Sequence, residues 1–140
     1  MTSAQMGMPA MFDSPGLLPL DRLECLRLLT TQEVGRVVFT SHALPAIQPV
    51  RFRLHLGALY FMVGPHGPLA ASHDDVVAFE VDSFQPDLRE GWCVTVVGRA
   101  AQVRDEGLMR DLAALPVLGW GLGDNRYMRI DPEVTAGRRL

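Results

Sequence analysis

The sequence predicts a mainly β fold, an antiparallel barrel of five or six strands with a few short capping helices. Short runs rich in β-branched and aromatic residues follow one another along most of the chain, and turns separate most of them. A parallel sheet would need a helix between most neighbouring strands, and the sequence does not supply them. The chain has 140 residues, of which 48% are hydrophobic, so we expect one domain with one sizeable core.

The first predicted element is a helix that follows a polar cap. Asp21 has the place of an N-cap, and Glu24, three residues later, is the second half of a capping box. Leu23, Leu26 and Leu29 form an apolar stripe. We therefore expect this helix to close one end of the core.

A short strand over residues 35–40 comes next, followed by a polar turn that ends at Pro45. Residues 49–56 then alternate strictly between apolar and polar side chains, which predicts a half-buried strand. The apolar face consists of Val50, Phe52, Leu54 and Leu56, and the polar face of Arg51, Arg53 and His55.

A tight turn at Leu56 and Gly57 is expected to join this strand to a partner strand over residues 58–63. Cross-strand neighbours follow from the length of the turn. The expected pairs are His55 with Ala58, Arg53 with Tyr60, and Arg51 with Met62. Arg51 would then lie beside the end of the strand that leads into the next loop.

That loop belongs to the segment LYFMVGPHGPLAAS, Leu59 to Ser72. The strand breaks at Gly64 and the chain restarts as a short helix near Leu69, a layout that often presents backbone N–H groups to a phosphate. The segment has no Lys or Arg, and its prolines donate no hydrogen bond. Plain turns are the favoured interpretation of the loop by itself, and a phosphate site is the alternative.

The rest of the chain predicts three strands and one helix. The strands cover residues 76–82, 91–104 and 126–132. Gly98 is expected to mark a bulge in the second of them. The helix covers residues 105–115, with Asp105 as its cap.

Composition excludes several classes of partner. A net charge of −3 argues against nucleic acid or an anionic membrane as a partner, and the absence of Lys excludes Schiff-base chemistry. No stretch reaches the roughly 18 apolar residues of a membrane span. Cys25 and Cys93 form no CxxC pair, which suits buried thiols in a reducing, cytoplasmic compartment. Residues 1–16 indicate a flexible tail before a domain over 17–140.

The sequence offers no recognisable catalytic or metal motif. The four histidines, His42, His55, His66 and His73, have no metal-ligand spacing, so we expect no metal site, although haem ligation by one of them stays open. A GxSxG nucleophile elbow is also missing from the sequence.

An ordered set of motifs over residues 20–140 resembles the flavin-binding split-barrel family related to pyridoxamine 5′-phosphate oxidase. The motifs are LDRLECLRLL, VGRVVFT, LPAIQPVRF, LYFMV, VVAFEVD, GWCVTVVGRA and MRIDPEVTAGRRL. The resemblance implies a six-stranded antiparallel split barrel that forms a homodimer. It further implies FMN, or sometimes a deazaflavin, in two clefts at the dimer interface.

The resemblance also implies which residues bind the cofactor. Matched by position, they are Val50, Arg51, Phe52, Phe61, Met62, Val63, Pro68, Leu69, Trp92 and Val94. Trp92 and Val94 would approach the flavin from the other subunit. Met62 and Pro68 stand where many relatives have the two cations that contact the phosphate. Our hypothesis is that Arg51 takes over part of this contact, with Arg53 or His66 assisting.

The implied function is that of an FMN-binding oxidoreductase with an unknown small-molecule substrate, and no catalytic acid or base is identified. Two alternatives stay open. One is a non-catalytic dimeric binding protein with a degenerate flavin site, and the other is a protein that binds deazaflavin or haem instead of FMN.

Overall fold

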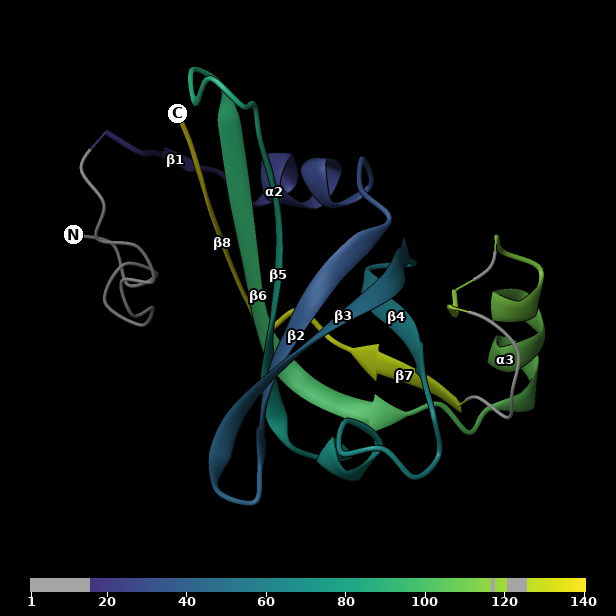
Figure 1. The fold of residues 1–140 in the computed structure, drawn as a ribbon. Helices are drawn as coiled ribbons and strands as arrows, with labels where there is room; N and C mark the ends of the chain where they lie inside the picture. Colours follow the sequence, from purple (N-terminus) through teal and green to yellow (C-terminus); the bar gives the residue numbers. More distant parts are fainter. Residues whose placement is uncertain (1–15, 117, 121–125) are drawn as a thin grey trace.

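Six antiparallel strands close into a barrel in the computed structural model, which describes residues 16–116, 118–120 and 126–140. Strand β6 pairs with β5 on one side and with β7 on the other, which closes the ring of β2, β3, β4, β7, β6 and β5 (Figure 1). Two further strands extend the sheet outside this ring, since β8 pairs with β6 and β1 pairs with β8. The predicted mainly β barrel is therefore confirmed.

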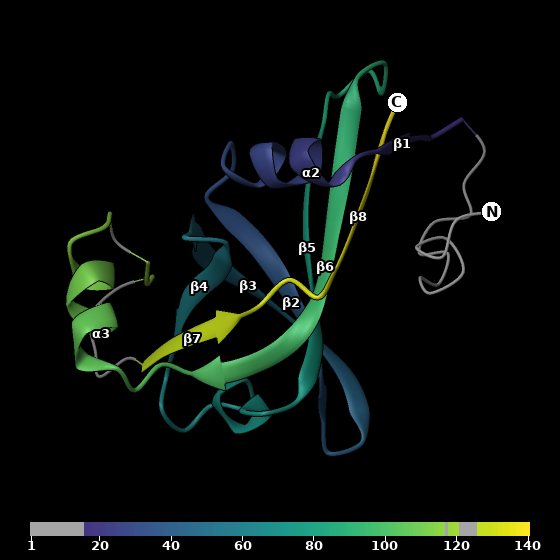
Figure 2. The ribbon, with the colours of Figure 1, turned by 180° about the vertical axis from the view of Figure 1, so that it is seen from behind.

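The strands, in chain order, are β1 (Leu18–Leu20), β2 (Val34–Ser41), β3 (Leu44–His55), β4 (Ala58–Val63), β5 (Val76–Phe84), β6 (Gly91–Gln102), β7 (Arg126–Ile130) and β8 (Val134–Arg139). The helices are α2 (Arg22–Leu29), the 3-10 helix η1 (Ala70–Ser72) and α3 (Glu106–Ala113). Helices α2 and α3 lie on different sides of the barrel (Figures 1 and 2). None of the described helices is long and apolar enough to cross a membrane. The tail predicted over residues 1–16 lies, apart from Gly16, outside the described residues.

Two tight hairpins set the register of β2, β3 and β4. Leu56 and Gly57 both have positive φ, 49° and 83°, as a two-residue hairpin turn of the primed type requires. The predicted pairs of His55 with Ala58 and of Arg53 with Tyr60 are confirmed. The ladder ends at Phe52 and Phe61, one residue short of the expected Arg51 and Met62 pair. Leu56, predicted on the apolar face, is 88% exposed because it forms the turn.

The hairpin between β2 and β3 is longer than predicted. Its turn consists of His42 and Ala43, again with positive φ, so β3 begins at Leu44 rather than at residue 49. The prediction placed Pro45 in a turn, whereas it pairs with Thr40 in the ladder. Pro lacks an N–H donor but is tolerated near the start of a strand, which explains the error.

Helix α2 covers one end of the main core. Asp21 is its N-cap and accepts a hydrogen bond from the Glu24 N–H at 2.8 Å, as predicted. The second half of the capping box is not used in the predicted way, because the Glu24 carboxylate binds the Arg27 guanidinium at 2.6 Å. Leu23 is 80% exposed, so its predicted core role is wrong. The buried side of the helix consists of Cys25, Leu28 and Leu29.

Strand β6 crosses the link between β7 and β8 at Gly98. The pairing of β6 with β5 keeps a constant register through Gly98, so the predicted bulge is wrong. A Cβ at this position would lie 1.9 Å from the Asp131 carbonyl oxygen. The glycine is there because another backbone approaches it closely. Helix α3 agrees with the prediction, and Asp105 caps it through a 2.8 Å bond from the Leu108 N–H.

Candidate cofactor-binding site

Six of the ten predicted cofactor-binding residues point into the barrel. Side chains alternate along a strand, so every second residue of β3, β4 and β6 faces the core. The six are at most 4% exposed, and they are Val50, Phe52, Phe61, Val63, Leu69 and Val94. Because their side chains fill the core, only their backbone atoms can face a ligand bound outside the barrel.

Three of the predicted residues do not belong to the main core. Arg51 on β3 and Met62 on β4 are half-buried, and Pro68, in the loop between β4 and η1, is exposed. The paired residues Phe52 and Phe61 point inward beside Arg51 and Met62, so Arg51 and Met62 share one outer face. Met62 packs there against a second hydrophobic cluster, which includes buried residues of α3 and β4. The structure thus brings two of the predicted contacts together.

Trp92, the remaining predicted residue, lies far from the loop. It is near the start of β6 and lines a cavity of about 300 Å³ together with Leu28 and Arg139. The chain just after the loop segment contacts β6 at Ala100, eight residues after Trp92. There the Asp74 N–H donates a hydrogen bond to the Ala100 carbonyl at 2.7 Å. At about 3.3 Å per residue, that separation is roughly 26 Å. Trp92 therefore lies near the opposite end of β6 from this loop.

Arg51 has donors available for a ligand. Its Nη1 donates to the Gly119 carbonyl oxygen at 3.4 Å, and none of the ion pairs among the described residues includes it. Arg53, two residues along the same face, has a partner in Glu33 at 3.4 Å. A guanidinium carries five N–H donors, so a single long bond leaves most of the Arg51 group free to bind an anion.

The loop between β4 and η1 is an open turn. The Gly67 N–H donates to the Gly64 carbonyl at 3.4 Å, and a Cβ at Gly64 would meet no atom within 4 Å. Leu69 is buried and anchors the loop on the main core, whereas His66 is exposed. The loop thus offers backbone donors but no Lys or Arg, so positive charge for a phosphate would have to come from another segment, such as Arg51 on β3 or Arg126, which pairs with Val63 at the end of β4.

A short segment after α3, residues 118–120, lies against β3 beside Arg51. Leu118 is 3% exposed and belongs to the second cluster, and Gly119 accepts the hydrogen bond from Arg51. The Trp120 Nε1 donates to the Pro49 carbonyl at 3.4 Å. These contacts join residues about seventy positions apart in the chain, which is why the sequence pattern did not predict them. The one available signal was an aromatic residue within a glycine-rich stretch.

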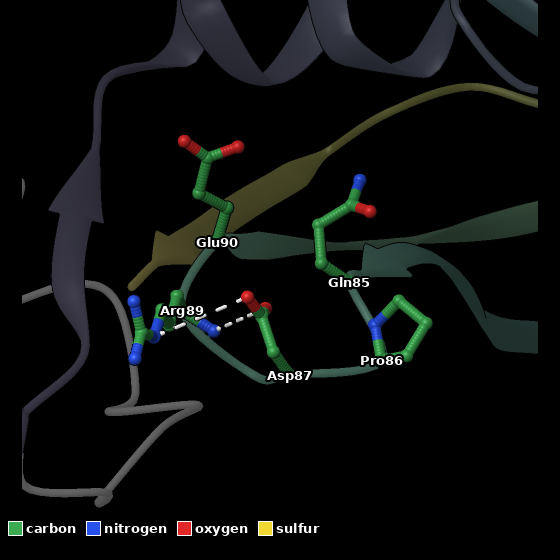
Figure 3. A pocket seen from close by; sticks show the side chains of 5 residues that line it. All are labelled: Gln85, Pro86, Asp87, Arg89 and Glu90. Atoms are coloured by element: carbon green, nitrogen blue, oxygen red, sulfur yellow. Dashed lines mark hydrogen bonds and ion pairs between the residues drawn. The ribbon is translucent and has the colours of Figure 1, made fainter.

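Another cavity, of about 530 Å³, lies at the tip of the hairpin between β5 and β6. Figure 3 shows its lining side chains, Gln85, Pro86, Asp87, Arg89 and Glu90. Asp87 accepts a hydrogen bond from the Arg89 backbone N–H at 3.0 Å and lies 4.0 Å from the Arg89 guanidinium, so part of the local charge is already neutralised. All five residues are exposed loop residues, and none was predicted as part of a site. The described residues hold no group of three or more His, Cys, Asp or Glu placed for a metal ion.

Comparison with known families decides what this barrel is. A family model described as pyridoxamine 5′-phosphate oxidase matches residues 21–139. The chain belongs to this family. An uncharacterized protein of Mycobacterium tuberculosis is 35% identical over 130 residues, which cover 89% of this chain and 86% of that protein. The family resemblance seen in the motifs is thereby confirmed.

Solved structures of several bacterial proteins have the same fold. The FAD binding protein from Mycobacterium smegmatis is 28% identical with a TM-score of 0.79, covering 88% of this chain and 98% of its own. A conserved protein of unknown function from Corynebacterium diphtheriae is 29% identical with a TM-score of 0.75, covering 87% of this chain and 96% of its own. Both likenesses extend over nearly the whole barrel.

Proposed function

We propose that this protein binds a flavin at the outer face of β3, beside Arg51 and the loop that follows β4, and acts as an oxidoreductase on a small molecule. The observation that carries the proposal is Arg51, a half-buried guanidinium without an ion-pair partner among the described residues, on the face that the family resemblance implies. The name of the Mycobacterium smegmatis neighbour, a FAD binding protein, supports a flavin. A bound flavin would supply hydride transfer, and the protein would supply position and charge.

The residues of the site favour FAD over FMN. FMN ends in a phosphomonoester that carries close to two negative charges near neutral pH. Met62 and Pro68 leave that group without the two usual cations, and each charge-assisted contact contributes about 1.5 to 3 kcal/mol. Their absence weakens FMN binding by about two to four powers of ten. The phosphates of FAD lie inside the molecule and carry about one charge each, which one arginine and backbone N–H groups suit better.

We also propose that the protein is a homodimer that associates through the outer face of the sheet formed by β3, β2, β5, β6 and β8. One row of side chains across this face is apolar on every strand, and it consists of Ile47, Val38, Ala78, Val97 and Val134. None of the five belongs to either hydrophobic cluster of the described residues, and Ile47 is 67% exposed. An uncovered apolar row of this kind is typical of an interaction surface.

The charges beside this row suit a second copy of the same chain. Arg36 lies on β2, 3.3 Å from Glu80 and 3.7 Å from Asp82, both on β5. A two-fold axis brings the same patch of both copies together, so the arginine of one copy can meet the carboxylates of the other. Trp92 does not belong to this face, because it points to the core side of β6 as Val94 does.

A second candidate function is a non-catalytic binding protein on the same fold. The observation that favours it is the replacement of both phosphate cations by Met62 and Pro68. This candidate predicts a colourless protein that takes up neither FAD nor FMN.

Absorbance spectroscopy separates the candidates. The purified protein is recorded between 300 and 600 nm, and then titrated separately with FAD, FMN, a deazaflavin and haem. The proposal predicts flavin uptake with FAD bound at least about tenfold more tightly than FMN, from the loss of one charge-assisted contact. Equal affinity for both flavins would contradict the preference for FAD, and no uptake of any flavin would contradict the function itself.

A further inference from the structure

Trp120 is a large aromatic side chain that the fold leaves uncovered. It is 64% exposed, although burial of a large aromatic residue is among the strongest contributions to folding. The other tryptophan, Trp92, is half-buried and packs against the main core. Single exposed apolar residues are common on protein surfaces. Exposure alone therefore assigns no role to Trp120, and its surroundings have to be considered.

Three contacts fix the position of Trp120. The residue two positions before it, Leu118, is buried in the second cluster. The intervening Gly119 accepts a hydrogen bond from Arg51, and the Trp120 indole donates to the Pro49 carbonyl, both at 3.4 Å. The chain is thus anchored on both sides of β3 residue 50. The hydrogen bond of its N–H fixes the position of the indole, while most of the indole surface stays exposed to solvent.

The neighbour of this indole is the cation of the proposed site. Gly119 contacts Arg51, and Trp120 contacts Pro49, two residues before Arg51 on the same outer face. A flat aromatic surface next to a guanidinium suits a ligand that combines a planar ring with a negatively charged group. Nucleotide-like molecules have this combination, and aromatic side chains bind their rings by stacking.

We propose that Trp120 stacks on a planar ring of the ligand whose phosphate lies at Arg51. The inference rests on the proposed flavin site and adds a residue to it that the family resemblance does not supply. Trp120 positions the ring, while Arg51 binds the charge. The adenine and the flavin ring of FAD are both planar, and the experiment below distinguishes them by fluorescence.

The test compares Trp120→Ala, Trp120→Phe and the wild type by titration with FAD, followed by absorbance and by flavin fluorescence. Loss of a stacking partner weakens binding by about 5- to 100-fold, so Trp120→Ala is expected to show that change. Trp120→Phe keeps an aromatic face and is expected to retain most of the affinity. Leu23→Ala, which removes an exposed apolar residue on α2, serves as the control.

Fluorescence provides a readout that a merely structural role would not change. If the flavin ring stacks on Trp120, bound flavin is quenched in the wild type and brighter in Trp120→Ala. If the adenine stacks there instead, affinity falls in Trp120→Ala without a gain in flavin fluorescence. The first result supports stacking of the flavin ring. The second supports stacking of the adenine when Trp120→Phe retains the affinity that Trp120→Ala loses, and an equal loss in both variants would contradict the inference.

Two outcomes would overturn the proposed stacking role of Trp120, and both can be distinguished from a failure of the proposed function. Unchanged FAD affinity in Trp120→Ala would remove Trp120 from the site while the wild type still binds flavin. A loss of affinity that accompanies a shift from dimer to monomer in size-exclusion chromatography would assign Trp120 to the subunit interface instead. A wild-type protein that binds no flavin would contradict the proposed function and the role of Trp120 together.

Discussion

Arg51 owes its place in the proposed site to the alternation of β3. Its two neighbours, Val50 and Phe52, are at most 2% exposed because they fill the core, so Arg51 has to point outward. The positive φ of Leu56 and Gly57 fixes the turn, and with it the position of β4 beside β3. This part of the site could be predicted from the sequence, because strand period and turn length are local properties.

Glu80 makes the stability of the fold depend on pH. Burial, together with the hydrogen bond and negative charge of Asp82, raises the pKa of Glu80 to about 7 against the attraction of Arg36. A raised pKa means that the folded state holds this proton over a pH range in which the unfolded state has lost it. The contribution to stability is therefore full below about pH 4.5 and is lost as the pH rises through 7.

We predict that the free energy of unfolding in urea falls less between pH 5 and pH 8 in Glu80→Gln than in the wild type. Glutamine stays neutral at every pH, so the difference between the two proteins isolates this group. Since the Glu80 side chain is 29% exposed, solvent screening limits the expected difference to about 1 to 2 kcal/mol. Glu133→Gln, on an exposed residue, is the control. Identical pH slopes in wild type and Glu80→Gln would contradict the assignment.

At the scale of elements, the barrel is constrained most where the link between β7 and β8 passes over Gly98 of β6. A Cβ at Gly98 would lie 1.9 Å from the Asp131 oxygen, and backbone on both sides leaves little room to move. We predict that Gly98→Ala lowers the free energy of unfolding by about 1 to 3 kcal/mol, as overpacking does, or prevents folding. Gly64→Ala is the matched control, since no atom lies within 4 Å of its added methyl group. Thermal unfolding of both variants checks this, and equal midpoints would contradict it.

Most elements could be predicted from the sequence, and those that were missed share one cause. Strands β3 and β4 were found through alternation and their turn, and both helix caps were found through local residue order. Strand β8 has no alternating pattern and ends in arginines, and it exists because it pairs with β6. Strand β1, only three residues long, pairs in turn with β8. Pairing between distant segments leaves no local signal.

Contacts between distant segments also explain which parts of the candidate site the sequence did not predict. Trp120 contacts Pro49 across 71 positions of the chain, and no spacing in the sequence indicates this contact. The family resemblance placed Arg51, Met62 and Pro68, and the structure adds that Met62 packs against the second cluster while Arg51 keeps donors available.

For the whole molecule, the apolar row on the outer face of the sheet predicts a dimer. We expect the wild type to elute as a dimer at micromolar concentration in size-exclusion chromatography and Val97→Lys to elute as a monomer. A lysine at Val97 would bring charge into the middle of the row, between Ala78 and Val134. Leu23→Lys, at a residue 80% exposed on α2, is expected to leave the dimer intact. A monomeric wild type, or a dimeric Val97→Lys, would contradict this interface.

The central claim is that a flavin lies at the outer face of β3 with its phosphate at Arg51. The most direct test is an equilibrium titration of the wild type and Arg51→Ala with FAD, with Arg89→Ala, an 87% exposed arginine in the hairpin between β5 and β6, as the control. We predict that Arg51→Ala binds FAD about 10- to 100-fold more weakly, while Arg89→Ala matches the wild type. Equal affinity of the wild type and Arg51→Ala for FAD would contradict the claim.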